Sequence, residues 1–189
     1  MKQTTMPETL NTSNTDSNKK LLVVGLENSG KSSIVLSIIG KSNLIDHMSL
    51  NPTQGPHITN FESSDSQFNI WDLGGQESYR DEYLDRFEEY ISGCSKILYV
   101  IDIQDVQRYE QALLYLEKIF YKIQQLDLNV DVSIFLHKYD PNLHEIHPEI
   151  TEESLDSLIN KVKKLIPKDF FFEIYKSTIY TIFDKFLVY

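Results

Sequence analysis

The chain has 189 residues, with 18 Lys and Arg against 28 Asp and Glu, so its formal net charge at pH 7 is −10. This acidity argues against a protein that holds nucleic acid or an anionic membrane by bulk electrostatics, because both need a basic surface. The single cysteine, Cys94, excludes an intramolecular disulfide and favours an intracellular protein. No apolar run approaches the roughly 18 residues of a membrane span, so we expect a soluble, cytoplasmic protein.

The first 18 residues are rich in Thr, Asn and Ser and have no apolar periodicity. They predict a flexible polar N-terminal tail over residues 1–18, followed by one domain over residues 19–189. Lys2 stands where N-myristoylation needs a glycine, and the chain stops at Tyr189 without a prenylation cysteine. We therefore expect no direct membrane anchor, and recruitment to membranes through partner proteins.

From residue 20 onward, short apolar runs alternate with segments of helical periodicity, which is typical of a mostly parallel α/β sheet. Strands are predicted at residues 20–25, 57–62, 67–72, 96–102, 132–137 and 170–175. The second lies at an antiparallel edge, before a polar hairpin turn at 61–67. Helical stripes at 31–39, 83–91, 109–123 and 155–166 indicate faces packed on the sheet. The prediction is a three-layer α/β fold, with a six-stranded, mostly parallel sheet and helices on both faces.

The first predicted strand ends in GLENSGKS, residues 25–32, which matches the phosphate-loop pattern G-x-x-x-x-G-K-[ST] between a strand and a helix. Its glycines let the backbone wrap closely, so that N–H groups and the helix N-terminus point at phosphate oxygens. Lys31 would reach the β- and γ-phosphates, and the Ser32 hydroxyl would bind Mg²⁺. The predicted phosphate-binding residues are Glu27, Asn28, Ser29, Gly30, Lys31, Ser32 and Ser33.

A second motif, DLGGQ at residues 72–76, follows the apolar strand that ends at Trp71. Asp72 would hold Mg²⁺ through a water molecule, Gly75 would offer its N–H to a γ-phosphate, and Gln76 would orient an attacking water. Thr53, within NPTQG at residues 51–55, is predicted to complete the Mg²⁺ coordination.

The third motif is HKYD, residues 137–140, at the end of another predicted strand. The Asp140 carboxylate can accept both N1–H and N2–H of guanine, donors that adenine lacks, while the Lys138 stem lies along the base. His137 belongs to the same predicted nucleotide site. Ser177 and Thr178, after the last predicted strand, would contact the guanine carbonyl through backbone N–H groups. A strand-to-helix cap is the alternative explanation for these two residues.

In combination, G-x-x-x-x-G-K-S, P-T-x-G and W-D-x-G-G-Q resemble the Arf side of the small GTPases of the Ras superfamily. His137, in place of the usual Asn of N-K-x-D, and SKILYVID at residues 95–102 are similar to the G domain of Rag (Gtr) proteins. The resemblance covers residues 20–189 and implies a P-loop NTPase fold of the G-domain type.

The resemblance also implies a molecular switch that binds GTP and GDP with Mg²⁺ and hydrolyses GTP, with Gln76 and Lys31 as catalytic groups. Its partners would be GAP, GEF and effector proteins, and it is compatible with dimerisation. None of the three arginines lies in residues 40–56, so we expect slow hydrolysis without a GAP. Arg80 and Arg86 fall on an acidic helix, interpreted as a solvated face or as an effector surface.

Two alternatives stay open at this point. One is a non-hydrolysing GTP-binding scaffold that keeps the domain as an interaction module. The other is a P-loop ATPase or nucleotide kinase, which Asp140 disfavours.

Overall fold

The structure, a computed structural model, describes residues 18–41, 43–63, 66–167 and 170–180. A single sheet has the strand order β2-β3-β1-β4-β5-β6. Its strands are β1 (Asn18–Gly25), β2 (Pro56–Ser63), β3 (Ser66–Leu73), β4 (Cys94–Asp102), β5 (Asp131–His137) and β6 (Phe172–Ser177). β2 pairs antiparallel with β3, and the other neighbouring strands are parallel. The predicted six-stranded sheet with one antiparallel edge strand is confirmed.

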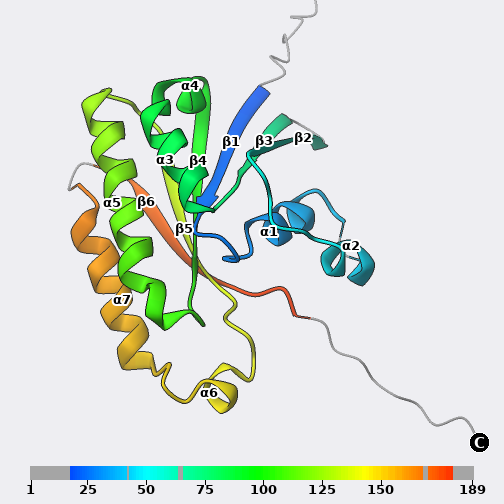
Figure 1. The fold of residues 1–189 in the computed structure, drawn as a ribbon, viewed down its shortest axis with the longest axis vertical. Coiled ribbons are helices and arrows are strands. Elements are labelled where there is room, and N and C mark those ends of the chain that lie inside the picture. The colour runs from blue at the N-terminus through cyan, green and yellow to red at the C-terminus, as the bar shows by residue number, and fades with distance from the viewer. Residues whose placement is uncertain (1–17, 42, 64–65, 168–169, 181–189) are drawn as a thin grey trace, which may run out of the picture.

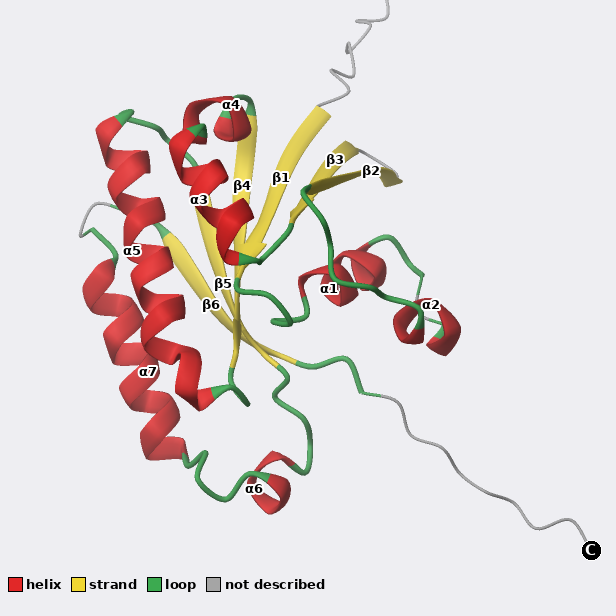
Figure 2. Ribbon diagram, in the orientation of Figure 1, coloured by secondary structure: helices red, strands yellow, loops and turns green. Residues whose placement is uncertain are grey.

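Helices cover both faces of this sheet. The elements are α1 (Lys31–Ile38), α2 (Leu44–Met48), α3 (Glu77–Asp85), α4 (Phe87–Ile91), the 3₁₀ turn η1 (Val106–Arg108), α5 (Tyr109–Gln125), α6 (Leu143–Ile146) and α7 (Glu152–Leu165). In Figures 1 and 2, α3, α4, α5 and α7 lie on one side of the strands, and α1 and α2 lie on the other. None of the helices in the described part of the chain has the length and apolar character that crossing a bilayer requires.

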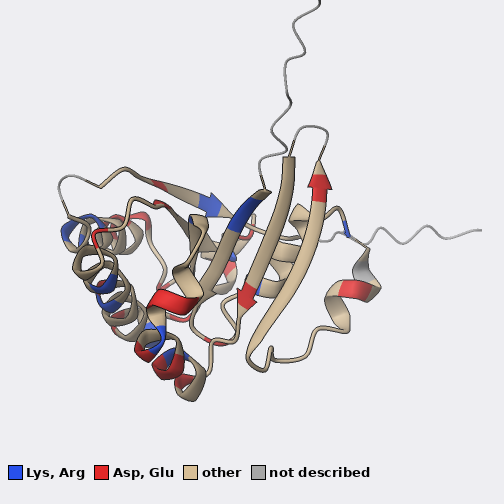
Figure 3. Ribbon diagram, turned by 90° about the horizontal axis from the view of Figure 1, so that it is seen from above, with Lys and Arg blue, Asp and Glu red and all other residues tan. Residues whose placement is uncertain are grey.

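Alternation along the central strands builds two separate cores. On β4, Ile97, Tyr99 and Ile101 join the larger core under α3, α4, α5 and α7, while Leu98 and Val100 join the smaller core under α1. Because successive side chains of a strand point to opposite faces, an almost wholly apolar strand serves both layers. Charged residues accordingly lie on the helices and near strand ends, and the middle of the sheet is uncharged (Figure 3).

The ends of several elements differ from the sequence prediction. The last strand is β6, Phe172–Ser177, because its pairing with β5 runs from Val132↔Phe172 to His137↔Ser177. The hairpin turn is shorter than predicted, since the β2–β3 ladder continues to Ser63↔Ser66. Residues 1–17 of the predicted tail lie outside the described residues, and Asn18 already begins β1.

The predicted helix around residues 83–91 is two helices, because the chain bends at Arg86 between α3 and α4. The Arg86 guanidinium pairs with Glu82 at 3.0 Å and with Glu89 at 2.6 Å, one on each helix. Tyr83 on α3 and Phe87 on α4 both join the larger core.

The larger core offers a test of the packing. Leu116 on α5 is completely buried, so Leu116→Ala should lower the free energy of unfolding by about 2–5 kcal/mol, through lost burial and a residual cavity. Leu114, on the same helix but 53% exposed, is the matched control, and Leu114→Ala should change stability by less than about 0.5 kcal/mol. Urea unfolding of both variants provides the measurement, and equal losses would contradict the assigned helix face.

Candidate functional site

The phosphate loop and two distant segments meet in one pocket at the carboxyl ends of β1 and β3. The pocket has a volume of about 360 Å³. It is lined by Glu27, Asn28, Gly30, Lys31, Ser32, Ser33, Leu50, Asn51, Pro52, Thr53, Gly75 and Gln76. Ser29, also in the loop, is not among the lining residues and has 1% of its surface exposed. Open α/β sheets bind ligands at this end of their strands.

Backbone conformation shapes the phosphate loop. Asn28 and Gly30 have φ angles of 60° and 89°, in the left-handed region. A side chain at Gly30 is also excluded by space, because a Cβ there would lie 2.4 Å from the His137 ring. Gly30 is the N-cap of α1 and contributes no side-chain cap, so the first N–H groups of α1 are free of that competition at the pocket.

Lys31 places a buried cation beside the loop. Its side chain is in the interior, and its Nζ donates to the Leu26 carbonyl at 2.7 Å. Burial lowers the pKa of Lys31 to about 8, against the opposing attraction of Asp72 and Glu27. An anionic group at the loop would stabilise the protonated form.

Three oxygen-bearing side chains converge next to Lys31. The Ser32 hydroxyl donates to Asp72 Oδ2 and lies 2.9 Å from the Thr53 hydroxyl. Burial raises the pKa of Asp72, and the hydrogen bond from Ser32 opposes that shift. The other carboxylate oxygen, Oδ1, is buried and has no hydrogen-bond partner among the residues that the structure describes. Two hydroxyls and a carboxylate with an unpartnered buried oxygen are a donor set that fits Mg²⁺.

The two glycines of DLGGQ are required by close backbone contacts. Gly75 accepts a hydrogen bond from the Glu27 N–H at 3.0 Å, and a Cβ at Gly75 would lie 2.3 Å from that nitrogen. Gly74 donates to the Gly55 carbonyl at 3.0 Å, and its Cβ would lie 2.6 Å from the Thr53 carbonyl oxygen. The pair therefore fits between the phosphate loop and residues 53–55, where a side chain would force them apart.

The interpretation of Arg80 as part of a solvated helix face is wrong. Arg80 is 9% exposed, its Nε donates to the Gly75 carbonyl at 3.0 Å, and its guanidinium lies 5.3 Å from the centre of the Tyr115 ring. Gln76, the N-cap of α3, is partly buried and faces the pocket. A signal for Arg80 was present in the sequence, because it stands three and four residues before Tyr83 and Leu84, on the same helix face.

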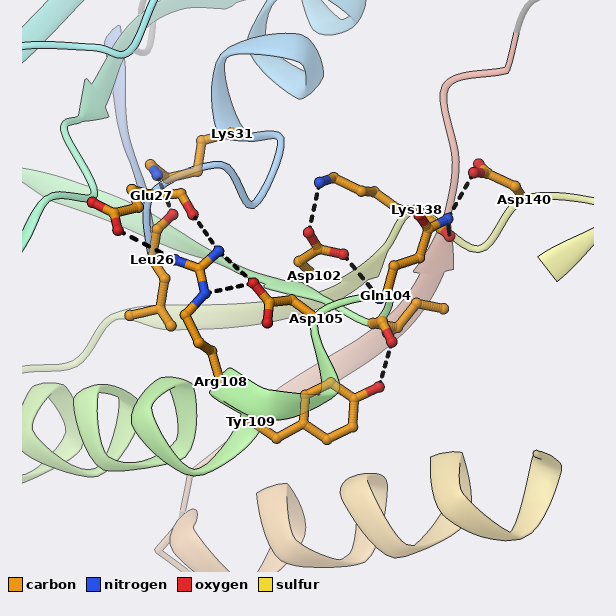
Figure 4. A network of polar contacts seen from close by, with 11 residues as sticks. Leu26, Glu27, Lys31, Asp102, Gln104, Asp105, Arg108, Tyr109, Lys138 and Asp140 are labelled. Carbon is orange, nitrogen blue, oxygen red and sulfur yellow. Dashed lines mark hydrogen bonds and ion pairs between the residues drawn. The ribbon is translucent and has the colours of Figure 1, made fainter. Parts of the chain in front are cut away.

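Sequence reasoning also missed Arg108 on η1. Its guanidinium pairs with Asp105 at 2.5 Å and with the Glu27 carboxylate at 3.3 Å, and so joins the loop after β4 to the phosphate loop (Figure 4). Eighty-one residues separate Arg108 from Glu27, so no local pattern reveals the contact.

The HKYD motif lies at the end of β5, beside the phosphate loop. His137 is 3% exposed, and its Nδ1 lies 3.0 Å from the Ser177 hydroxyl. Burial, and to a lesser extent the neighbouring Lys138, lowers the pKa of His137. Lys138 has a φ of 66°, and its Nζ pairs with Asp102 at 2.5 Å.

Thr178 donates its hydroxyl hydrogen to Asp140 Oδ1 at 2.5 Å. These two residues, both predicted to contact the guanine base, are therefore in direct contact. Ser177 does not follow the last strand, as the sequence predicted, but is the final residue of β6. Its position opposite His137 in the β5–β6 ladder directs its hydroxyl to that ring.

Comparison with known proteins places these motifs in a family. Residues 20–188 match the model of the Gtr1/RagA G protein conserved region. ADP-ribosylation factor-like protein 9 of Homo sapiens is 34% identical over 104 residues, which are 55% of this chain and 52% of that protein. Ras-related GTP-binding protein C of Mus musculus is 29% identical over 178 residues, 90% of this chain and 44% of that protein. The chain thus spans about half the length of the curated relatives it matches.

Two solved structures share the fold. One is the Arl6 BBS3 small GTPase from Trypanosoma brucei with the bound nucleotide analogue GppNp, with a TM-score of 0.66, 20% identity, and coverage of 86% of this chain and 88% of that one. The other is the mammalian SRP receptor, with a TM-score of 0.61, 18% identity, and coverage of 85% and 92%. These identities bear on the fold alone, which is that of a P-loop GTPase. The family match spans nearly the whole chain, and the chain belongs to the Gtr1/RagA family of small GTP-binding proteins.

Proposed function

We propose that this chain is a switch that binds GTP and GDP with Mg²⁺ and hydrolyses GTP slowly. The observation that carries the proposal is the cluster of Ser32, Thr53 and Asp72 beside Lys31, in a pocket lined by the phosphate loop and Gln76. Three segments far apart in sequence supply the groups that phosphoryl transfer from a nucleoside triphosphate needs.

At the phosphates, the loop residues 27–33 and the N-terminus of α1 supply N–H donors, and Lys31 supplies positive charge. Ser32 and Thr53 would hold Mg²⁺ directly and Asp72 through water. When bound, the ion would neutralise charge that develops on the phosphate oxygens. Gln76 would orient a water molecule whose oxygen attacks the γ-phosphorus. The bond to the bridging oxygen breaks, and GDP and phosphate leave.

At the base, Asp140 would accept the two guanine N–H groups, and Lys138 would lie along the ring. The His137 ring packs against Gly30 of the phosphate loop, and the Ser177 hydroxyl is hydrogen-bonded to that ring. Thr178 contacts the base-reading carboxylate itself. This assignment favours guanine over adenine, because adenine would leave the carboxylate without its donors.

Slow turnover follows from how the nearby arginines are engaged. Arg80 donates to the Gly75 carbonyl, and Arg108 is paired with Asp105 and Glu27. Because both guanidinium groups already have partners, neither is placed to stabilise the charge that develops on the transferring phosphoryl group. A GAP would supply this stabilisation of the transition state.

Switching would use the contacts of Gly74 and Gly75. Gly75 accepts from the Glu27 N–H of the phosphate loop, and Gly74 donates to Gly55. A γ-phosphate competes for the same loop donors, so its arrival and loss would shift residues 53–55 and 74–76 together. GEFs and effectors would recognise that shift.

We assign the G domain to residues 19–189, preceded by a polar tail. We assign the protein to the cytoplasm, with recruitment to membranes through partner proteins.

Hydrolysis is tested with Gln76→Leu. Losing the group that orients the water should lower the single-turnover rate of GTP hydrolysis by at least about tenfold, while GTP affinity changes by less than about threefold. Gln124→Leu, at an exposed position of α5, is the control and should hydrolyse at the wild-type rate. Tight GTP binding by the wild type without turnover would support the non-hydrolysing scaffold instead.

Base recognition is tested with Asp140→Asn. The amide offers one donor and one acceptor, which suits xanthine better than guanine, so the preference should shift from GTP toward XTP. Competition against a fluorescent nucleotide measures GTP, XTP and ATP affinities for both proteins. Equal binding of ATP and GTP by the wild type would contradict the assigned role of Asp140.

The lowered pKa of Lys31 leads us to expect proton uptake when Mg²⁺–GTP binds. Its pKa of about 8 should rise when phosphate oxygens approach, so Mg²⁺–GTP binding at pH 8 should take up about half a proton per site and much less at pH 7. Calorimetry in buffers of different ionisation enthalpy measures the uptake. Lys31→Arg should abolish it, because arginine stays protonated throughout. A binding heat at pH 8 that does not depend on the buffer would refute the assignment.

A further inference from the structure

Gln104 lies outside every motif but touches the residue assigned to base recognition. It stands in the loop between β4 and η1, and its Nε2 donates to Asp140 Oδ2 at 2.8 Å and to the Lys138 carbonyl at 2.9 Å. A side-chain amide nitrogen carries two hydrogens, so both of its donors are used on the HKYD loop. Figure 4 shows Gln104 among the residues of this network.

The loop that carries Gln104 is itself fixed to the same motif. Asp102 Oδ1 accepts the Gln104 backbone N–H at 2.9 Å, and its Oδ2 pairs with Lys138 Nζ. The Ile103 N–H donates to the His137 carbonyl at 3.1 Å. The position of Gln104 is therefore fixed by its own loop. Its contact with the Lys138 carbonyl helps to hold Lys138 in the left-handed conformation, which residues with a side chain rarely adopt.

The two oxygens of Asp140 are held from opposite sides. Thr178 donates to Oδ1 and Gln104 donates to Oδ2. Two donors at fixed positions set the rotation of the carboxylate about its Cβ–Cγ bond. A carboxylate has about four lone-pair sites, so each oxygen keeps one site for a further donor. The carboxylate is thus oriented and still able to accept a pair of N–H groups.

We propose that Gln104 is a positioning residue that sets selectivity for guanine by orienting Asp140. The inference rests on the proposed function, in which Asp140 pairs with N1–H and N2–H of guanine. Bidentate pairing requires both oxygens in the plane of the two donors, so a carboxylate that rotates freely loses more affinity for guanine than for a base with a single donor on that edge.

The experiment compares GTP with ITP, whose base lacks the N2 amino group. Gln104→Ala should weaken GTP binding about tenfold and ITP binding about threefold or less, so the preference for GTP over ITP narrows. Gln104→Met retains the length of the side chain without the donors and should behave alike. Gln124→Ala, at an exposed position of α5, is the control and should leave both affinities unchanged.

A second arm asks whether Gln104 acts through Asp140. In an Asp140→Ala background, adding Gln104→Ala should change GTP affinity by less than about twofold, because no carboxylate remains to orient. Thermal unfolding of each variant shows whether its fold is retained.

The outcomes separate the inference from the function on which it rests. If Gln104→Ala and Gln104→Met lower the affinities for GTP and ITP by the same factor, Gln104 is only structural and the inference fails. The same conclusion follows if Gln104→Ala still lowers GTP affinity in the Asp140→Ala background. If GTP affinity is unchanged in both variants, the inference fails while the proposed function stands. Wild-type protein that binds no guanine nucleotide would overturn the proposed function itself.

Discussion

The site depends on one close approach, that of the Gly74–Gly75 backbone to its two neighbours. Residues 26–27 lie on one side and residues 53–55 on the other, both at distances that leave no room for a Cβ. Backbone hydrogen bonds to Glu27 and Gly55 join the three segments. Thr53 lies in one of these segments, and Lys31 and Gln76 follow the other two closely. Main-chain contacts therefore help to set the spacing of the functional groups.

A second constraint comes from the sheet. Parallel pairing brings the ends of β1, β4, β5 and β6 to one edge, where the register opposes Asp102 to His137 and His137 to Ser177. The loops that follow these strands can then bind one another. Asp102 pairs with Lys138, Gln104 with Asp140, and Arg108 with Glu27, so the phosphate and base regions share one polar network (Figure 4).

The sequence predicts contiguous features well, since the information for them is local. The succession of short apolar runs and helical stripes was enough to predict the fold, and the phosphate-loop pattern located one part of the site. The limits of β6 were not predictable, because the pairing partner rather than the apolar run FFF decides where the strand ends. Gln104 and Arg108 were missed because each gains its partner from a loop distant in sequence, and a polar residue in a loop carries no pattern of its own.

The net charge of −10 describes the surface of the molecule better than its pocket. Burial and hydrogen bonding hold the cations Lys31, Arg80 and Arg108 around the phosphate loop. Burial is the main cause of the lowered pKa of Lys31, and the charges of Arg80 and Arg108 lower it further. Asp72 and Glu27 oppose them, but Glu27 is paired with Arg108, and the hydroxyls of Ser32 and Thr53 share Asp72. The acidic side chains of the α3–α4 region, such as Glu77, Glu88 and Glu89, are exposed to solvent, where water and salt screen them. A strongly acidic protein can therefore present a local field that attracts phosphate.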